Sequence, residues 1–184
     1  MVSSYLTSVN KQFEYYKSLG DKTIHQLNID ELKKEFSNDS NSISIIVKHM
    51  AGNMLSRWTN FLTEDGEKEW RHRDEEFIES FETKEELLEY WQKGWDCLFN
   101  ALQPLHSNQL EDIIYIRNQG HTITEGINRQ MMHYAYHVGQ ITFIGKLIKG
   151  ERWQSLSIPK GKSSEYNSDK FNQAKQRKHF TEDM

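Results

Sequence analysis

The strongest constraint on the fold is a set of four long stretches in which apolar residues recur at the 3.6-residue period of an α-helix. Only two prolines, Pro104 and Pro159, interrupt the 184 residues, so these stretches can be helical over most of their length. The predicted helices cover about residues 2–20, 43–62, 83–102 and 124–149. The apolar face of the first is formed by Val2, Tyr5, Leu6, Val9, Phe13 and Tyr16.

Local signals predict where these helices begin and end. The boundary residues are Ser42 as N-cap of the second helix, Thr83 with Glu86 as a capping box for the third, Pro104 after the third, and Gly20 and Gly150 as C-terminal glycines of the first and fourth. Within the fourth helix, Gly139 and Gly145 are expected to allow close approach of a neighbouring helix.

The connections are polar. A helical turn is expected over 29–36, a long loop over 63–82, and a hairpin with arms at 113–116 and 122–123. Four amphipathic helices with long first and second crossovers predict an all-α four-helix bundle. This domain is expected to span residues 1–160, and residues 161–184 are expected to form a polar tail packed on it or extending from it.

Composition excludes several classes of protein. The net charge is -4 with both signs interspersed, which argues against a general nucleic-acid binder. Cys97 is the sole cysteine, so an internal disulfide is impossible and a reducing cytoplasm is the expected setting. We read Cys97 as a small residue at the edge of the core, with a reactive thiol as the alternative. No apolar run approaches the ~18 residues of a membrane span, and the N-terminus lacks a signal-peptide pattern.

Two histidines of the fourth helix suggest a metal site. His133 and His137 are four residues apart, so they point the same way and can bind one transition metal together. They can equally be two residues of a polar helix face. In a bundle, metal ligands come from facing helices, and His49 of the second helix is the expected third ligand. His121, near the start of the fourth helix, is held as a reserve candidate.

Three neutral imidazoles would leave an open position on the metal, as in catalytic zinc sites. Such a metal lowers the pKa of a bound water or thiol. The chain is not a zincin protease, because Tyr134 stands where that motif needs glutamate. A hydrolase would need a protein base, and none is evident beside the histidines. Thiol transfer is therefore favoured over hydrolysis.

A longer pattern surrounds the histidines. It consists of His49 followed by Ala51-Gly52-Asn53-Met54-Leu55-Ser56-Arg57-Trp58, and of His133-Tyr134-Ala135-Tyr136-His137-Val138-Gly139-Gln140-Ile141. Two shorter motifs accompany it, Gly66-Glu67-Lys68-Glu69-Trp70-Arg71 and Leu156-Ser157-Ile158-Pro159. Over most of residues 1–160 the chain resembles the DinB/YfiT-like metalloprotein superfamily, in a branch whose members have no known activity.

The resemblance implies a four-helix bundle, often a homodimer, with one divalent metal, zinc or nickel, on His49, His133 and His137. Some relatives are S-transferases that use low-molecular-weight thiols such as bacillithiol or mycothiol, and others resemble maleylpyruvate isomerases. The implied partners are thus a small thiol and an electrophile, with no nucleic acid and no membrane.

Three polar residues are expected to line the pocket beside the metal. Asn53 and Arg57 lie one and two turns beyond His49, and Gln140 lies two turns beyond His133. We expect Arg57 to hold an anionic group of the cofactor or substrate, and Gln140 to hydrogen-bond a ligand or a histidine. The alternatives are a salt bridge to a bundle acid for Arg57 and an interhelical hydrogen bond for Gln140. Trp58 and Tyr136 are assigned to the core or an interface.

Three functions follow as hypotheses. The leading one is a metal-dependent S-transferase that joins a small thiol to an electrophile. The second is a metal-dependent hydrolase using bound hydroxide. The third is a non-catalytic metal-binding or stress-response protein, which would have a fourth protein ligand such as His121.

Overall fold

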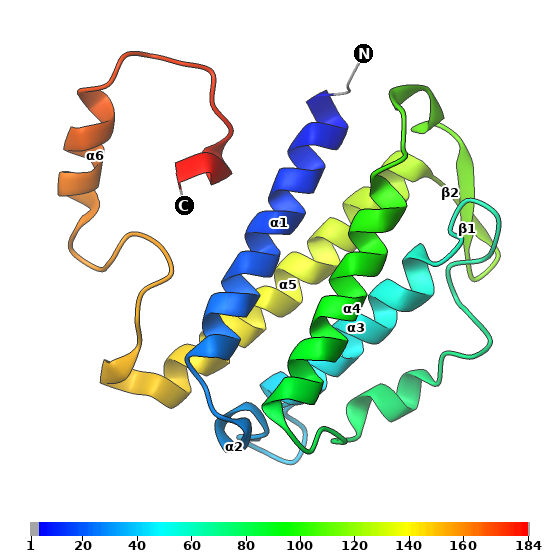
Figure 1. Cartoon of the computed structure of the whole chain (residues 1–184), viewed down its shortest axis with the longest axis horizontal. Helices are drawn as coiled ribbons and strands as arrows, with labels where there is room; N and C mark the ends of the chain where they lie inside the picture. The colour runs from blue at the N-terminus through cyan, green and yellow to red at the C-terminus, as the bar shows by residue number, and fades with distance from the viewer. Residues whose placement is uncertain (1–3, 184) are drawn as a thin grey trace.

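The computed structural model describes residues 4–183 and is mostly helical, with one two-stranded sheet. Four long helices lie side by side (Figure 1): α1 (Ser4–His25), α3 (Ile43–Trp58), α4 (Lys84–Leu102) and α5 (Ile123–Lys149). The shorter elements are α2 (Ile29–Leu32), α6 (Ser163–Phe171), and the 3-10 helices η1 (Arg73–Phe77), η2 (Ser107–Gln109), η3 (Gly150–Arg152) and η4 (Phe180–Asp183). The predicted helical class is confirmed.

Helix α1 does not end at Gly20, as the sequence suggested, but continues to His25. The glycine serves packing instead, because a Cβ at position 20 would lie 2.7 Å from the Trp91 ring. Asp21, the residue after Gly20, accepts a hydrogen bond of 2.7 Å from the Trp91 Nε1–H. The predicted contribution of Val2 to this helix lies outside the described residues.

Helix α3 begins as predicted, with the Ser42 side chain accepting a hydrogen bond from the Ile45 N–H. It ends at Trp58, four residues before the predicted end, since the chain turns at Asn60 with φ +49°. Phe61 continues the apolar pattern of the sequence although it lies beyond the helix. Its side chain is buried because the chain folds back and places the Phe61 ring against Trp58, with ring centroids 5.3 Å apart.

Helix α4 starts at the predicted Thr83 and Glu86 capping box and ends at Leu102. Its close approach to α3 occurs at Gly94, where a Cβ would lie 2.8 Å from the Ala51 Cα. Helix α3 is buried along almost its whole length, since α4, α5 and η1 all pack against it. Side chains on α3 can therefore face an enclosed interior.

The hairpin has its first strand where it was predicted, and its second strand begins three residues earlier than predicted. Strands β1 (Ile113–Ile116) and β2 (Gln119–Thr122) are antiparallel, and Arg117 and Asn118 turn between them with φ +56° and +58°. Of the predicted second arm, 122–123, Thr122 belongs to β2, whereas Ile123 is the first residue of α5, which the Thr122 side chain caps in a capping box with Glu125.

Helix α5 ends at Gly150, which has φ +54°, as predicted. The predicted close approach is confirmed at Gly145, where a Cβ would lie 2.5 Å from the Thr23 methyl of α1. At Gly139 no helix of the same chain approaches, since no described atom lies within 4 Å of an added Cβ.

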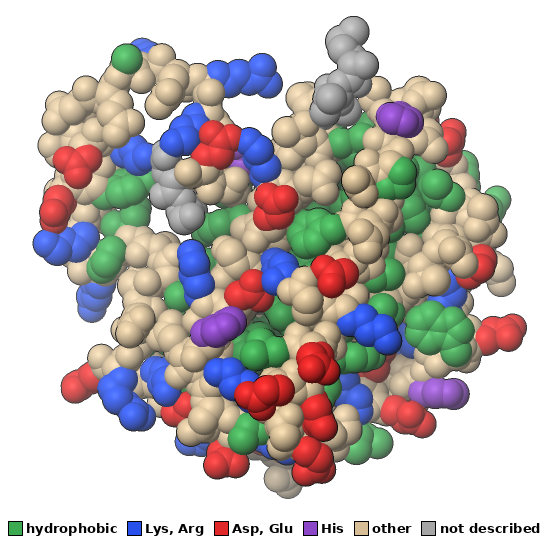
Figure 2. Space-filling view, viewed as in Figure 1, with side chains coloured by type: hydrophobic (Ala, Val, Ile, Leu, Met, Phe, Trp, Pro, Cys, Tyr) green, Lys and Arg blue, Asp and Glu red, His purple; other side chains and the backbone are tan. Residues whose placement is uncertain are grey.

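The chain after α5 forms α6 and returns to α1 (Figure 1), where Phe180 packs on Tyr15 with ring centroids 5.8 Å apart. Positive and negative side chains are intermixed on the face shown in Figure 2. Within residues 4–183, no helix has the length and apolar character needed to cross a lipid bilayer.

Candidate metal centre

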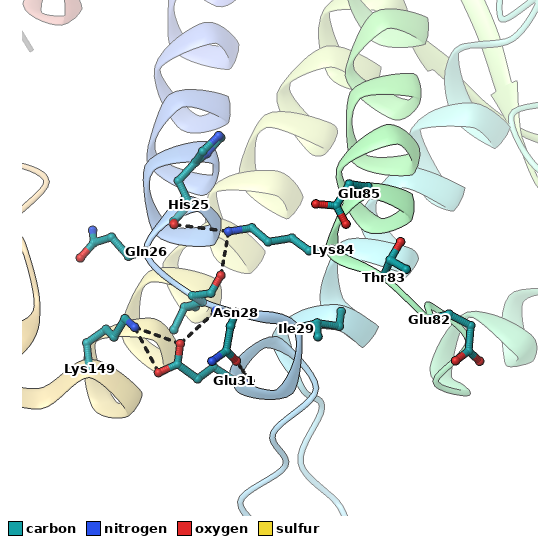
Figure 3. A pocket seen from close by; sticks show the side chains of 11 residues that line it. His25, Gln26, Asn28, Ile29, Glu31, Glu82, Thr83, Lys84, Glu85 and Lys149 are labelled. Atoms are coloured by element: carbon teal, nitrogen blue, oxygen red, sulfur yellow. Dashed lines mark hydrogen bonds and ion pairs between the residues drawn. The ribbon is translucent and has the colours of Figure 1, made fainter.

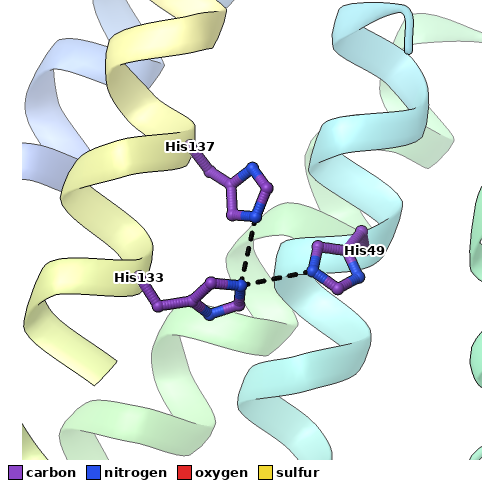
Figure 4. A group of neighbouring side chains, drawn as sticks. All are labelled: His49, His133 and His137. Atoms are coloured by element: carbon purple, nitrogen blue, oxygen red, sulfur yellow. Dashed lines mark hydrogen bonds between the residues drawn. The ribbon is translucent and has the colours of Figure 1, made fainter. Parts of the chain in front are cut away.

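Three histidines from two helices converge at one point (Figure 4). His49 comes from α3, and His133 and His137 from successive turns of α5. The Nε2 atom of His133 lies 3.3 Å from Nε2 of His49 and 3.1 Å from Nε2 of His137. Within the described part of the chain, these three are the group of histidine, cysteine or acidic side chains arranged to hold a metal ion.

The spacing of the three nitrogens fits a divalent metal. Zinc binds imidazole nitrogen at about 2.0–2.1 Å, so two nitrogens of a tetrahedral site lie about 3.3–3.4 Å apart. The two Nε2 separations, 3.3 and 3.1 Å, are close to that value. All the potential ligand atoms lie within 4.8 Å of one another.

The outer nitrogens of two rings face hydrogen-bond acceptors. Nδ1 of His49 lies 2.9 Å from Oε2 of Glu76, and Nδ1 of His137 lies 2.7 Å from Oε1 of Gln140. A neutral imidazole carries one N–H, so each ring donates from Nδ1 and leaves the Nε2 lone pair free. Both lone pairs point at Nε2 of His133, which has at most one hydrogen to offer. A cation held by all three nitrogens would satisfy them together.

Burial keeps two of the rings neutral. Burial, together with the neighbouring His137 and His49, lowers the pKa of His133 to about 3. Burial also lowers the pKa of His137, against the opposing effect of its hydrogen bond with Gln140. His49 is 6% exposed and stacks on Phe77 with centroids 5.1 Å apart. Neutral imidazole is the form that binds metals.

Sequence reasoning missed Glu76, which it placed in a featureless loop. Glu76 belongs to η1 and is clamped by Arg71, whose Nε and Nη2 donate hydrogen bonds of 2.8 and 2.9 Å to its two oxygens. Burial by itself would raise the pKa of Glu76, but hydrogen bonds from His49 and Arg71 outweigh it and lower the pKa. The one sequence feature that pointed to a neighbour here was Gly52, a glycine inside a helix one turn from His49. The glycine leaves room for Glu76, because a Cβ at position 52 would lie 2.4 Å from Glu76 Oε1.

Two of the predicted pocket residues, Asn53 and Arg57, line a cavity of about 220 Å³ together with His49 and His133. Asn53 accepts a hydrogen bond of 3.1 Å from the Tyr134 hydroxyl. Arg57 donates to the Gly66 carbonyl and, at 3.0 Å, to Glu67. Arg57 thus forms a salt bridge, as in the alternative interpretation, and its partner lies on a loop rather than on a bundle helix.

Gln140, the third predicted pocket residue, is not among the residues that line this cavity. It bonds the metal-site residue His137 on one side and donates to the Tyr136 hydroxyl at 3.0 Å on the other. Tyr136 itself is 63% exposed, so it does not belong to the core, whereas Trp58 does.

The reserve candidate His121 lies outside the cluster. It is part of β2, and its Nε2 lies 3.3 Å from Nη1 of Arg129. Cys97 is half-buried, with Sγ 3.5 Å from the Thr59 hydroxyl, which agrees with a position at the core edge.

A larger hollow of about 610 Å³ lies where α1, α2 and α4 meet (Figure 3). Three of its charged groups already have partners: Lys149 pairs with Glu31 at 2.9 Å, and Lys84 donates to the carbonyls of His25 and Leu27. The histidine cluster, with its unsatisfied nitrogens, is therefore the stronger candidate site.

Comparisons with known proteins concern the fold and the family of the chain. A solved structure described as a conserved protein from Enterococcus faecalis is similar to this chain, with TM-score 0.61 and 19% identity over 82% of this chain and 99% of that one. This likeness concerns the fold. No curated protein matches the chain in sequence. The family model described as "Protein of unknown function (DUF1572)" matches residues 1–162, and the chain therefore belongs to the DUF1572 family.

Proposed function

We propose that the protein is a metal-dependent S-transferase that binds one divalent metal, zinc or nickel, on His49, His133 and His137. The observation that carries the proposal is the convergence of three Nε2 atoms, at 3.1 and 3.3 Å, with the outer nitrogens of two rings directed at acceptors. This is the arrangement in which neutral imidazoles present lone pairs to a cation.

The resemblance to DinB/YfiT-like metalloproteins supports the same proposal. The histidines of the resembling motifs are the three that cluster, although 84 positions separate His49 from His133. The four long helices lie side by side with two long connections, which supports a four-helix bundle of that superfamily. Its reducing setting would be the cytoplasm, where small thiols stay reduced.

A divalent metal in this site would act as a Lewis acid that lowers the pKa of a thiol. In the proposed reaction the thiol loses its proton to solvent, its sulfur forms a bond to the electrophilic carbon, and the leaving group departs with its electron pair. The chain's own residues orient the site: Glu76 and Gln140 hold the rings of His49 and His137. Asn53 and Arg57 line the adjoining space.

The lining of that space favours thiol transfer over hydrolysis. Among the described residues, those lining the cavity include no aspartate, glutamate, lysine or tyrosine. The nearby Glu76 is engaged by His49 and Arg71, and hydrogen bonds from these two residues lower its pKa. A metal can ionise a bound water as well as a thiol, but hydrolysis also gains from a protein base, whereas transfer of a metal-bound thiol needs no strong base from the protein. A non-catalytic site with a fourth ligand is also less favoured, since His121 lies elsewhere.

The first test is the metal content of protein purified without affinity tag or chelator, measured by plasma mass spectrometry. We expect near-stoichiometric zinc or nickel in the parent, and its loss in His49→Ala and His133→Ala. His106→Ala, which changes a histidine outside the cluster, is the matched control. A parent that is free of metal and cannot be loaded would refute the proposal.

The second test measures consumption of bacillithiol with chlorodinitrobenzene as electrophile. Metal-loaded protein should accelerate the reaction, and chelation should abolish the effect. Activity that survives full removal of the metal would contradict the proposed chemistry. Hydrolysis of ester probes without any thiol would instead favour the hydrolase alternative.

We also propose a homodimer formed through α5. An exposed apolar row runs along this helix, comprising Met132, Tyr136, Phe143 and Leu147. Its members are placed symmetrically about the Gly139–Gln140 bond, so a second copy crossing antiparallel would pair Met132 with Leu147 and Tyr136 with Phe143.

Light scattering should give a dimer mass for the parent and a monomer mass for Phe143→Lys. Phe171→Lys, at an exposed site on α6, should leave the mass unchanged. A monomeric parent would refute the dimer.

A further inference from the structure

The cavity beside the histidine cluster has an unusual lining. Of the seven arginines in the chain, five line this one space: Arg57, Arg71, Arg73, Arg117 and Arg129. None of the lysines lines it, although the chain has more lysines than arginines. The choice of arginine matters, because the planar guanidinium binds carboxylate and phosphate groups with two parallel hydrogen bonds.

The five arginines come from four separate parts of the chain, since Arg71 and Arg73 are two positions apart. They belong to α3, the loop before η1, η1 itself, the turn between β1 and β2, and the first half of α5. Bringing five cations together costs electrostatic energy, and the cost is largest for Arg57 and Arg71, whose side chains are 6% and 3% exposed. Anions near these two guanidinium groups lower that cost.

The chain supplies two carboxylates to these guanidinium groups. Glu67 bonds Arg57, Arg71 and Arg117, and Glu76 bonds Arg71. Arg73 and Arg129 have no carboxylate partner among the described residues: Arg73 lies over the Phe77 ring, and Arg129 bonds His121. Asp65 is a third carboxylate nearby, since the charge of Arg57 helps to lower its pKa, so five guanidinium groups against three carboxylates leave a formal excess of two positive charges.

Two buried polar atoms of the lining also have no partner in the described structure. They are Nε of Arg57, a donor, and Oε1 of Gln130, an acceptor, and their residues are 7% and 4% exposed. A buried polar group without a hydrogen bond is costly, and a bound ligand commonly satisfies it. The cavity volume, about 220 Å³, corresponds to about seven molecules of bulk water, which suits a small metabolite.

We propose that the arginine-lined cavity binds a small organic dianion, a dicarboxylate or a phosphate monoester, beside the histidine cluster. His49 and His133 line the same cavity, so a dianion bound there would lie beside the metal site. The inference rests on the proposed function to this extent: the dianion would be the substrate or cofactor group that reaches the metal. Arg73 and Arg129 at the exposed rim would provide charge for capture. Arg57 and Gln130 would contact the ligand inside.

The test is calorimetric titration of the whole protein with succinate and with inorganic phosphate at low salt. We expect saturable 1:1 binding of at least one probe that weakens as salt is added. Saturation by succinate alone indicates a dicarboxylate, and saturation by phosphate alone indicates a phosphate monoester. The neutral analogue succinamide should not bind.

Matched double variants locate the binding site. Arg73→Gln with Arg129→Gln removes two rim charges at exposed positions, so the fold should be retained. We expect binding at least about tenfold weaker. Arg152→Gln with Arg177→Gln removes the same charge at the two arginines outside the cavity and should change the affinity less than about twofold. Failure of both probes to bind, or equal weakening by both double variants, overturns the proposal.

A third variant separates this proposal from the metal site. His137→Ala removes a proposed metal ligand but does not belong to the cavity lining. Anion binding that persists in this variant and depends on the rim arginines supports the dianion cavity even if the parent binds no metal. A parent that takes up metal but binds neither probe keeps the metal proposal and overturns this one.

Discussion

At the scale of single residues, the most informative contact is between His49 and Glu76, which are 27 positions apart. The carboxylate accepts from Nδ1 of His49 and thereby decides which nitrogen of the ring faces the other two histidines. Arg71 holds the carboxylate in place and keeps it ionised. The chemistry of the cluster thus depends on residues that carry no ligand atom.

Glu76→Gln tests this positioning role. We expect the affinity for zinc to fall about 10- to 100-fold, as for other partners of ligating histidines, while the helical content is retained. The measurement is competition with a chromophoric chelator. Glu75→Gln, an exposed neighbour in η1, is the matched control and should keep the affinity of the parent. Equal affinities for the two variants would remove Glu76 from the description of the site.

At the scale of elements, the distance between helices is set by small residues. Gly94 of α4 sits against the backbone of Ala51 in α3, two residues from His49. Because the neighbouring atom is backbone, an added methyl group has to push the helices apart. The site on α3 is therefore sensitive to packing on the opposite side of that helix.

Gly94→Ala should lower the free energy of unfolding by about 1–3 kcal/mol in spite of its better helix propensity. Urea denaturation followed by circular dichroism gives the value. Lys93→Ala, at the adjacent exposed position, should stay within about 0.5 kcal/mol of the parent. A neutral or stabilising Gly94→Ala would mean that the α3–α4 contact is looser than described.

The Asp65 carboxylate helps to hold the hairpin to the rest of the protein, alongside the Glu67–Arg117 ion pair and the hydrogen bond from the Gly66 N–H to the Tyr115 carbonyl. Asp65 accepts hydrogen bonds from the backbone N–H groups of Arg117 and Asn118, both at 2.8 Å, and of Glu67 at 2.7 Å. Burial alone would raise the pKa of Asp65, but these three donors outweigh it and hold the pKa below its ordinary value of 3.8. A lowered carboxyl pKa adds stability above pH 3.8, and that stability is lost as the pH falls through the native pKa.

Asp65→Asn should therefore cost about 1 kcal/mol at neutral pH, since the site is only partly buried. The difference from the parent should start to shrink as the pH falls below 3.8 and shrink further as the pH falls through the lowered native pKa, where the parent carboxyl in the folded protein becomes neutral too. Urea titrations from pH 3 to 7 measure both. A difference that does not depend on pH would show that the charge of Asp65 has no part in anchoring the hairpin.

At the scale of the whole molecule, the histidine cluster links α3 to α5 across 84 positions of sequence. A ligand that binds only the folded state stabilises it by about 2.7 kcal/mol when its free concentration is 100 times its Kd. Metal loading should thus raise the melting temperature of the parent by about 5–10 °C. Calorimetry of stripped and loaded protein measures the shift. His133→Ala should show no shift, and an equal shift in that variant would place the stabilising metal elsewhere.

The sequence by itself determined most of the helical architecture. Apolar residues at helical spacing, the Ser42 cap, the Thr83 capping box and the glycine at 150 are local signals, and the structure follows each of them. The pairing of His133 with His137 is also local, because four residues make about one turn of one helix. These features need no knowledge of the rest of the chain.

Tertiary structure alone decided the rest. The role of Gly20 depends on Trp91, the partner of His49 depends on η1, and the arginine cavity gathers side chains from four separate parts of the chain. None of these contacts has a periodic signature, since each joins segments whose relative placement is set by packing. A buried polar group has no water to bond and must find a partner in the protein. Which groups are buried depends on how the whole interior is assembled, so the sequence alone does not give these partners.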